Sequence, residues 1–257
     1  MIFLRAIPFL VFGCVFGSFL TVVVHRVPKG ESIVRPRSRC PSCGTQIRSA
    51  DNIPVLSWIL LRGRCSSCGA RISVIYPLTE LATGALFVAV ALAFEDLWVA
   101  VMMAPFLGLL LALSVIDIRH KIVPNRLVYP SFLLFAGYLV VAALAGGGVD
   151  LLRALIGCLA YGSGLLLVAL ISPKGMGMGD VKLAALIGLV LGSLGLRYVA
   201  VAAAAGVALG GVGALVALAL GANRKTAIPF GPYLAAGAAV GAFFGAQIAD
   251  WYVNLLT

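Results

Sequence analysis

Long apolar runs constrain this chain more than any other feature. Apolar residues make up 62% of its 257 residues and charged residues only 11%, whereas a soluble domain carries about 25% charged residues. The apolar residues gather in runs close to the length that crosses a bilayer. The sequence therefore predicts an all-α, polytopic membrane helix bundle. We expect about eight transmembrane helices, at residues 2–24, 77–94, 97–116, 127–145, 151–171, 181–196, 198–220 and 228–249.

Basic residues indicate how these spans are oriented. With eight spans and the N-terminus outside, 16 of the 19 Lys and Arg residues fall on one side. Because cytoplasmic loops are enriched in positive charge, that side is assigned to the cytoplasm and both termini to the outside. The net charge of +10 then reflects topology and contact with anionic lipid, and we do not expect a nucleic-acid partner. The first run lacks a small-residue cleavage site before Arg26 and is expected to stay as a span.

One predicted loop is large enough to hold a small domain. It divides the chain into a first transmembrane helix (1–24), a cytoplasmic four-cysteine domain (25–76) and a seven-helix membrane domain (77–257). The loop carries two CxxC pairs separated by 21 residues, each followed by glycine, at Cys40, Cys43, Cys65 and Cys68. Two such turns direct four thiolates at one centre, which is the tetrahedral set that Zn²⁺ prefers.

Other uses of these cysteines are less favoured. The cytoplasm is reducing, which argues against structural disulfides, and iron is the remaining alternative to zinc. Four thiolates fill the coordination sphere of the metal. The predicted zinc is therefore structural rather than catalytic.

Two carboxylates fall at the cytoplasmic ends of predicted spans. Asp117 ends the third span, and Asp180 begins the sixth after a link whose glycines are Gly175, Gly177 and Gly179. A charged residue at membrane depth is costly and by default marks a functional site. A facing pair can share one proton, so that one member acts as base and the other as acid when water attacks a peptide carbonyl. The pair therefore predicts aspartyl protease chemistry.

The neighbours of Asp180 are expected to support it. The glycines leave room for an extended substrate backbone, while the helix start and Lys182 favour the anionic carboxylate. Structural roles are the alternative for both aspartates. Asp180 would then cap a helix, and Asp117 would pair with Arg119 or Lys121.

Glycines four residues apart occur in several spans. This spacing lets helices approach closely and predicts a tightly packed bundle. The glycines are Gly13 and Gly17, Gly188 and Gly192, Gly206 and Gly210, and Gly237, Gly241 and Gly245.

Several motifs together resemble a known family. Gly177-Met178-Gly179-Asp180, followed by Val181-Lys182, resembles the GxGD motif of the prepilin peptidases, the leader peptidases and N-methyltransferases of type IV pilus and type II secretion systems. The resemblance covers nearly the whole chain and includes Gly17-Ser18-Phe19-Leu20, both CxxC pairs, Asn52-Ile53-Pro54 with Ser57, Tyr76-Pro77 with Glu80, Asp117, and Phe230-Gly231-Pro232. The family often has Pro-Asp where this chain has Pro124-Asn125. Asn125 can cap the following helix but cannot serve as an acid.

The resemblance implies an intramembrane aspartyl endopeptidase of the bacterial inner membrane, with Asp117 and Asp180 as its catalytic pair. Such enzymes cut the basic leader peptide of a prepilin or pseudopilin at the cytoplasmic face. They then methylate the new N-terminus with S-adenosylmethionine. Glu80 is the candidate residue for methyl transfer, and membership of a structural ion pair is its alternative.

Two other classes of function remain open from the sequence. A proton-coupled transporter would use Asp117 and Asp180 as a relay, although such sites tend toward the bilayer middle. A membrane-tethered zinc adaptor would bind protein through residues 25–76 and would have inert spans. The substrate and the oligomeric state are not predicted.

Overall fold

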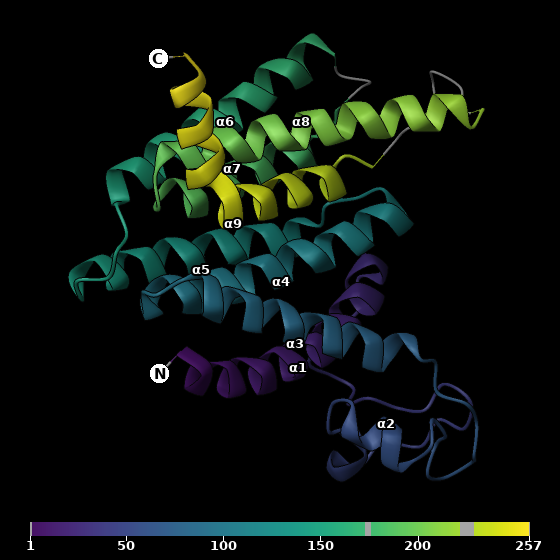
Figure 1. Ribbon diagram of the computed structural model, residues 1–257. Helices are drawn as coiled ribbons and strands as arrows, with labels where there is room; N and C mark the ends of the chain where they lie inside the picture. Colours follow the sequence, from purple (N-terminus) through teal and green to yellow (C-terminus); the bar gives the residue numbers. More distant parts are fainter. Residues whose placement is uncertain (1, 173–175, 222–228, 257) are drawn as a thin grey trace. The chain divides into compact units, whose positions relative to one another are not determined.

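The computed structural model describes residues 2–172, 176–221 and 229–256, and its regular secondary structure within these ranges is helical. No strand occurs among them, and the loop holds two isolated β-bridges. The predicted all-α membrane bundle is confirmed (Figure 1). Its elements are α1 (Ile2–Arg26), η1 (Val27–Lys29), η2 (Ser49–Asn52), α2 (Leu56–Leu60), α3 (Ile75–Ala93), α4 (Leu97–His120), α5 (Asn125–Leu144), α6 (Leu151–Ile171), α7 (Met178–Gly192), α8 (Leu196–Ala219) and α9 (Gly231–Leu256).

The chain divides into two compact units, residues 1–95 and 96–257. The first unit contains α1, α3 and the loop between them, and the second contains α4 to α9. This boundary differs from the predicted one at residues 76 and 77, because α3 packs along α1 within the first unit.

Seven helices among the described residues are long and apolar enough to cross a bilayer. The remaining long helix, α7, has 15 residues and a length of about 22 Å, which is shorter than a hydrocarbon core of about 30 Å. It packs mainly on α6 and also contacts α5, α8 and α9, so most of its residues are buried. The predicted sixth span is thus a short helix enclosed by its neighbours.

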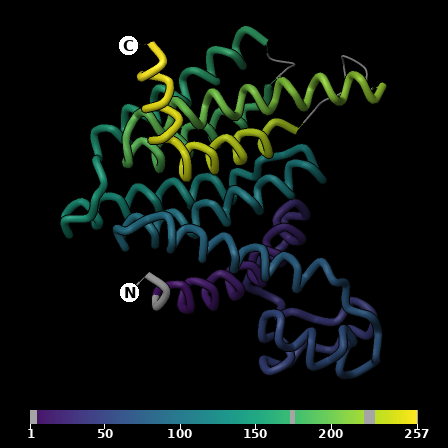
Figure 2. Tube along the Cα trace, viewed as in Figure 1, coloured from purple at the N-terminus to yellow at the C-terminus, as the bar shows by residue number. Residues whose placement is uncertain are grey.

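Glycines form the closest helix contacts, as the spacing predicts. A Cβ atom added at Gly13 of α1 would lie 2.7 Å from the Cα atom of Gly84 in α3. In the second unit, Gly188 of α7 packs on the backbone of Gly157 in α6, and Gly237 of α9 packs on Gly206 in α8. These approaches explain why α6 and α7, and α8 and α9, run side by side (Figure 2).

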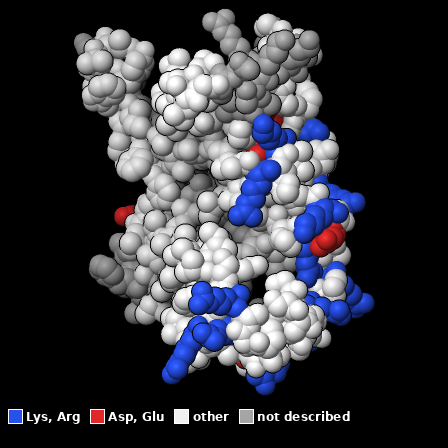
Figure 3. Space-filling view, turned by 90° about the vertical axis from the view of Figure 1, so that its right-hand side faces the viewer, with Lys and Arg blue, Asp and Glu red and all other residues white. Residues whose placement is uncertain are grey.

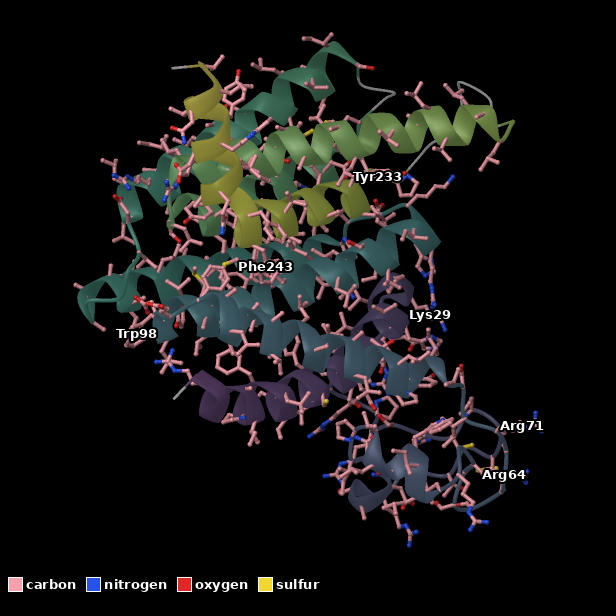
Figure 4. All side chains as sticks on the ribbon, viewed as in Figure 1. Lys29, Arg64, Arg71, Trp98, Tyr233 and Phe243 are labelled. Carbon is pink, nitrogen blue, oxygen red and sulfur yellow. The ribbon has the colours of Figure 1, made fainter. Side chains whose placement is uncertain are left out.

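Polar contacts gather where the helices of the second unit begin and end. The Asp96 carboxylate accepts hydrogen bonds from the N–H groups of Trp98 (2.7 Å) and Gly148 (2.6 Å), which starts α4 beside the α5–α6 connection. The Tyr138 hydroxyl donates to the Trp98 carbonyl oxygen at 2.8 Å, close to the labelled Trp98 in Figure 4. Asp117 lies at the opposite end of α4.

Candidate active site and metal centre

Asp117 lies in the last turn of α4, with only 5% of its surface exposed. Its Oδ2 atom accepts a hydrogen bond of 2.9 Å from the backbone N–H of Gly231. Within the described residues, the three ion pairs found do not include Asp117. Arg119 and Lys121 are exposed, so the structure does not support the alternative in which one of them neutralises Asp117.

Gly231 is the first residue of α9. It belongs to the Phe230-Gly231-Pro232 element of the resemblance, but the sequence predicted no role for it beside Asp117. A Cβ atom at this position would lie 2.8 Å from Oδ2 of Asp117, closer than a side chain normally comes. Pro232 follows at the second helical position, where a missing N–H leaves no helical bond unmade. A Gly-Pro pair at a helix start was the available signal, but it gave no indication of which residue it contacts.

Asp180 is the third residue of α7 and is 8% exposed. Its Oδ2 atom accepts from the Gly177 N–H at 3.3 Å, and its own N–H donates to the Gly177 carbonyl oxygen at 3.1 Å. Asp180 is therefore not the N-cap that the alternative described; the N-cap is Gly177, and Asp180 accepts a hydrogen bond from its N–H at the third helical position. This hydrogen bond is the one that Asp180 makes at the helix start. It occupies one carboxylate oxygen and is compatible with a chemical role for the other.

The glycines before Asp180 serve packing as well as access. A Cβ atom on Gly179 would lie 2.8 Å from the Cβ atom of Val123, so this glycine lets α7 begin against the segment that follows α4. An added Cβ atom at Gly177 would meet no atom closer than 3.6 Å. Gly175 lies outside the described residues.

Asp117 and Asp180 are close enough for their charges to interact. They come from helices 63 positions apart in the sequence, and the structure brings them together in a buried setting. Two carboxylates whose charges interact resist simultaneous ionisation, so one can hold a proton while the other is ionised. The arrangement can therefore supply a base and an acid.

Lys182 does not support the Asp180 anion as expected. Its Nζ atom donates to Oδ1 of Asn125 at 3.0 Å and lies 5.1 Å from the centre of the Tyr129 ring. Asn125 is the first residue of α5 and makes no capping bond; the N-cap position belongs to Pro124. The expected cap is therefore wrong, and both side chains join α5 to the start of α7 instead.

The two CxxC turns have the same backbone. In the first, the Cys40 N–H donates to the carbonyl oxygen of Thr45, and the Gly44 N–H donates to the carbonyl oxygen of Cys40, both at 2.9 Å. In the second, the Cys65 N–H donates to the carbonyl oxygen of Ala70 at 2.8 Å, and the Gly69 N–H donates to the carbonyl oxygen of Cys65 at 2.9 Å. Each turn ends on a glycine in the left-handed region, with φ of 70° at Gly44 and 71° at Gly69, which other residues adopt only with strain.

The four cysteine sulfur atoms converge as the spacing predicts. They lie within 4.8 Å of one another, and those of Cys40 and Cys68 are 3.9 Å apart. A tetrahedral zinc site with Zn–S bonds of about 2.3 Å places its sulfur atoms about 3.8 Å apart. Cys40, Cys43, Cys65 and Cys68 could therefore hold one metal ion.

Asp51 connects the two halves of this loop. Its Oδ2 atom accepts from the Ser66 hydroxyl at 2.7 Å and from Nε of Arg48 at 3.1 Å. These hydrogen bonds hold the pKa of Asp51 below its ordinary value. Because a lowered pKa means that the fold favours the charged form, this contribution is present at neutral pH and is lost as acid protonates Asp51.

Glu80 is a buried residue of the first unit, and its expected part in methyl transfer stays a prediction. It is 7% exposed, and its Oε2 atom accepts a 2.7 Å hydrogen bond from the backbone N–H of Val55. No ion pair in the described part of the chain includes it. Its observed partner is the loop of its own unit.

The surface of the loop is strongly basic. Nine Lys and Arg residues lie between Arg26 and Arg71, against Glu31 and Asp51. Arg64 and Arg71 form one of the isolated bridges and extend outward from the loop (Figure 4). On the face drawn in Figure 3, Lys and Arg clearly outnumber Asp and Glu.

Comparison with known proteins identifies the family. Residues 11–94 match the bacterial peptidase A24 N-terminal domain, and residues 104–222 match the type IV leader peptidase family. A protein of Stutzerimonas stutzeri named prepilin leader peptidase/N-methyltransferase is 38% identical over 271 residues, covering 95% of this chain and 92% of the relative. Proteins of the same name from Bacillus subtilis (strain 168) and Pseudomonas aeruginosa are 35% and 36% identical, over 95% and 94% of this chain and 96% and 91% of the relatives. No solved structure matches the chain. With two family domains in order and relatives matched along nearly their whole length, the chain belongs to the type IV leader peptidase family.

Proposed function

We propose that this chain is a prepilin peptidase, a membrane-embedded aspartyl endopeptidase that removes the leader from a prepilin or pseudopilin and N-methylates the new N-terminus. The relatives named prepilin leader peptidase/N-methyltransferase support both activities. The structural observation that carries the proposal is the buried pair of Asp117 and Asp180. Aspartyl proteolysis requires two interacting carboxyl groups as its acid and base.

The hydrogen bonds of the pair support different roles for the two oxygen atoms of each carboxyl group. Gly231 donates to one oxygen of Asp117, and Gly177 donates to one oxygen of Asp180. Among the described residues, no other hydrogen bond to these carboxyls from a side chain or backbone is seen, and we assign the second oxygen of each to water and substrate. The ionised member takes a proton from the attacking water, and the protonated member gives a proton to the carbonyl oxygen or the leaving amine.

The position of the pair disfavours the two other classes. Asp117 lies three residues before the end of α4 and Asp180 two residues after the start of α7, whereas transporter relays tend toward the bilayer middle. An adaptor with inert spans would have no use for two buried, interacting acids. The family relationship also favours neither class.

The protein is a multi-pass protein of the inner membrane. We place the loop and both aspartates at the cytoplasmic face and the termini outside, on the basis of the 16 basic residues that this topology gathers on one side. The proposed substrate carries a short basic leader, as the resemblance implies. S-adenosylmethionine is the methyl donor that N-methylation requires, and the sequence shows no motif for it.

Mass measurement of a prepilin product tests the function directly. The purified protein, in detergent or nanodiscs, is incubated with a prepilin and labelled S-adenosylmethionine. The expected product lacks its leader and is heavier by one labelled methyl group at the new N-terminus. A product that is shortened but unlabelled would contradict the methyltransferase half, and an intact precursor would contradict the peptidase half.

We propose that the metal of the loop is a structural Zn²⁺ ion. The sulfur spacing and the two matching turns support this assignment. The expected result is one zinc per chain by elemental analysis. Substituting both Cys43 and Cys68 by Ser should remove the metal, whereas the matched change Cys14→Ser in α1 should retain it. Stoichiometric iron in protein grown with both metals available would contradict zinc.

A further inference from the structure

Glu80 belongs to a group of motif residues that the proposed site does not use. It lies in the second turn of α3, and its buried carboxylate accepts from the Val55 N–H, 25 residues earlier in the loop. The other members of the group are Gly17 of α1, the Asn52-Ile53-Pro54 segment and Ser57 of α2. All of them lie in the first unit.

Val55 has an unusual backbone conformation. Its φ is 62° and its ψ is −52°, and the Leu56 N–H donates to the Pro54 carbonyl oxygen at 2.6 Å. These values describe a γ-turn of the rare form with positive φ. For a β-branched residue this is a true outlier, and it persists only where surrounding contacts hold it. The bond from Glu80 is a contact of this kind.

The strained turn is rigidly connected to the rest of the loop. The Ser57 hydroxyl accepts from the Ile53 N–H at 2.8 Å and donates to the Ala50 carbonyl oxygen at 3.0 Å. The neighbouring Trp58 donates from Nε1 to the Ile72 carbonyl oxygen at 3.2 Å. The turn and α2 are thereby bonded to segments on both sides of the second CxxC pair.

On the opposite side, Glu80 is fixed by the packing of α1 on α3. A Cβ atom on Gly17 would lie 2.9 Å from the Cα atom of Glu80, so α1 passes directly against the backbone that carries this residue. At the end of α1, Nη1 of Arg26 donates to the carbonyl oxygens of Ser32 (3.1 Å) and Pro36 (2.8 Å). The loop is thus held from α1 by Arg26 and from α3 by Glu80.

We infer that Glu80 is a positioning residue whose carboxylate holds Val55 in its strained turn and so fixes the metal-binding loop onto the α1–α3 pair. The role requires a hydrogen-bond acceptor and no proton transfer. A glutamine at this position can accept the same bond, whereas an alanine cannot.

Hydrogen exchange of the full-length protein, followed by mass spectrometry, tests the anchor. In Glu80→Ala, amide exchange in the peptide covering residues 53–60 should accelerate about tenfold or more, because a charge-assisted bond to a strained turn is lost. In Glu80→Gln most of the protection should remain. The matched control Glu31→Ala removes an exposed acid from the same loop and should leave this peptide unchanged. Unaltered exchange in Glu80→Ala would overturn the inference, as would equal loss of protection in Glu80→Gln.

The strained turn supplies a second variant. Glycine adopts positive φ without steric cost, so Val55→Gly should restore much of the lost protection when combined with Glu80→Ala. Absence of any rescue in the double variant would contradict the role of the turn. The consequence for methylation rests on the proposed function, but the exchange measurement does not. If Glu80→Gln lost methylation while its exchange stayed normal, Glu80 would also be a chemical participant, and the statement that its role requires no proton transfer would be wrong.

Discussion

Substitution of either Asp117 or Asp180 by Asn is expected to reduce leader cleavage about a thousandfold or more. Asn keeps the size of the side chain and an oxygen that can accept the bond from Gly231 or Gly177, but it cannot take up or release the shared proton. General acid–base groups contribute a factor of about 10² to 10⁴ in rate, and here both functions depend on one pair. The mass of the prepilin product gives the rate.

The control for this prediction is Asp250→Asn. Asp250 is an exposed carboxylate paired with Arg197 at 3.2 Å, far along α9 from Gly231, and its loss should leave cleavage unchanged. All three variants should keep their metal and their helical circular dichroism. Methylation of a substrate that has already been cut should also persist in the Asp117 and Asp180 variants. Normal cleavage by either of them would refute the catalytic pair.

Hydropathy was sufficient to predict the long helices, and cysteine spacing was sufficient to predict the metal cluster. Apolar runs and breakers predict transmembrane helices because a lipid-exposed backbone must satisfy its own hydrogen bonds. The CxxC turns predict their metal site because each is a local structure that depends on few neighbours. Both predictions use interactions within one segment or with the solvent, and these are visible in sequence.

Contacts between helices were less accessible to sequence reasoning. The first unit ends at Glu95 because α3 packs on α1. This pairing depends on how closely the two helix surfaces fit, as at Gly13 and Gly84, and such a fit is not visible in the hydropathy of either helix. Lys182 was expected near the neighbouring Asp180, yet it reaches Asn125, 57 residues away. Because the lysine side chain is long and flexible, the position of its backbone does not determine where its charge lies.

The contact between Gly231 and Asp117 leads to the second large effect. The two residues are 114 positions apart, so no local pattern could predict the contact. In Gly231→Ala, the new Cβ atom would meet Oδ2 of Asp117 at 2.8 Å and its Cγ atom at 3.3 Å. Asp117 must then move, or α9 must shift. Because a displacement of about 1 Å can cost a hundredfold in rate, we expect cleavage to fall about 10- to 100-fold, mainly in kcat.

A matched glycine separates this local effect from a general effect of added bulk. Gly211 of α8 is also helical and has nothing within 4 Å of an added Cβ atom, so Gly211→Ala should cleave normally. Gly231→Ala should retain its metal and most of its thermal stability, since Ala is compatible with a helix start whose φ is not in the left-handed region. Wild-type kcat in Gly231→Ala would show that the position of Asp117 tolerates displacement. A lower kcat with unchanged stability would instead mean that the start of α9 sets the geometry of the acid pair, because the Gly231 N–H fixes which Asp117 oxygen remains available to water.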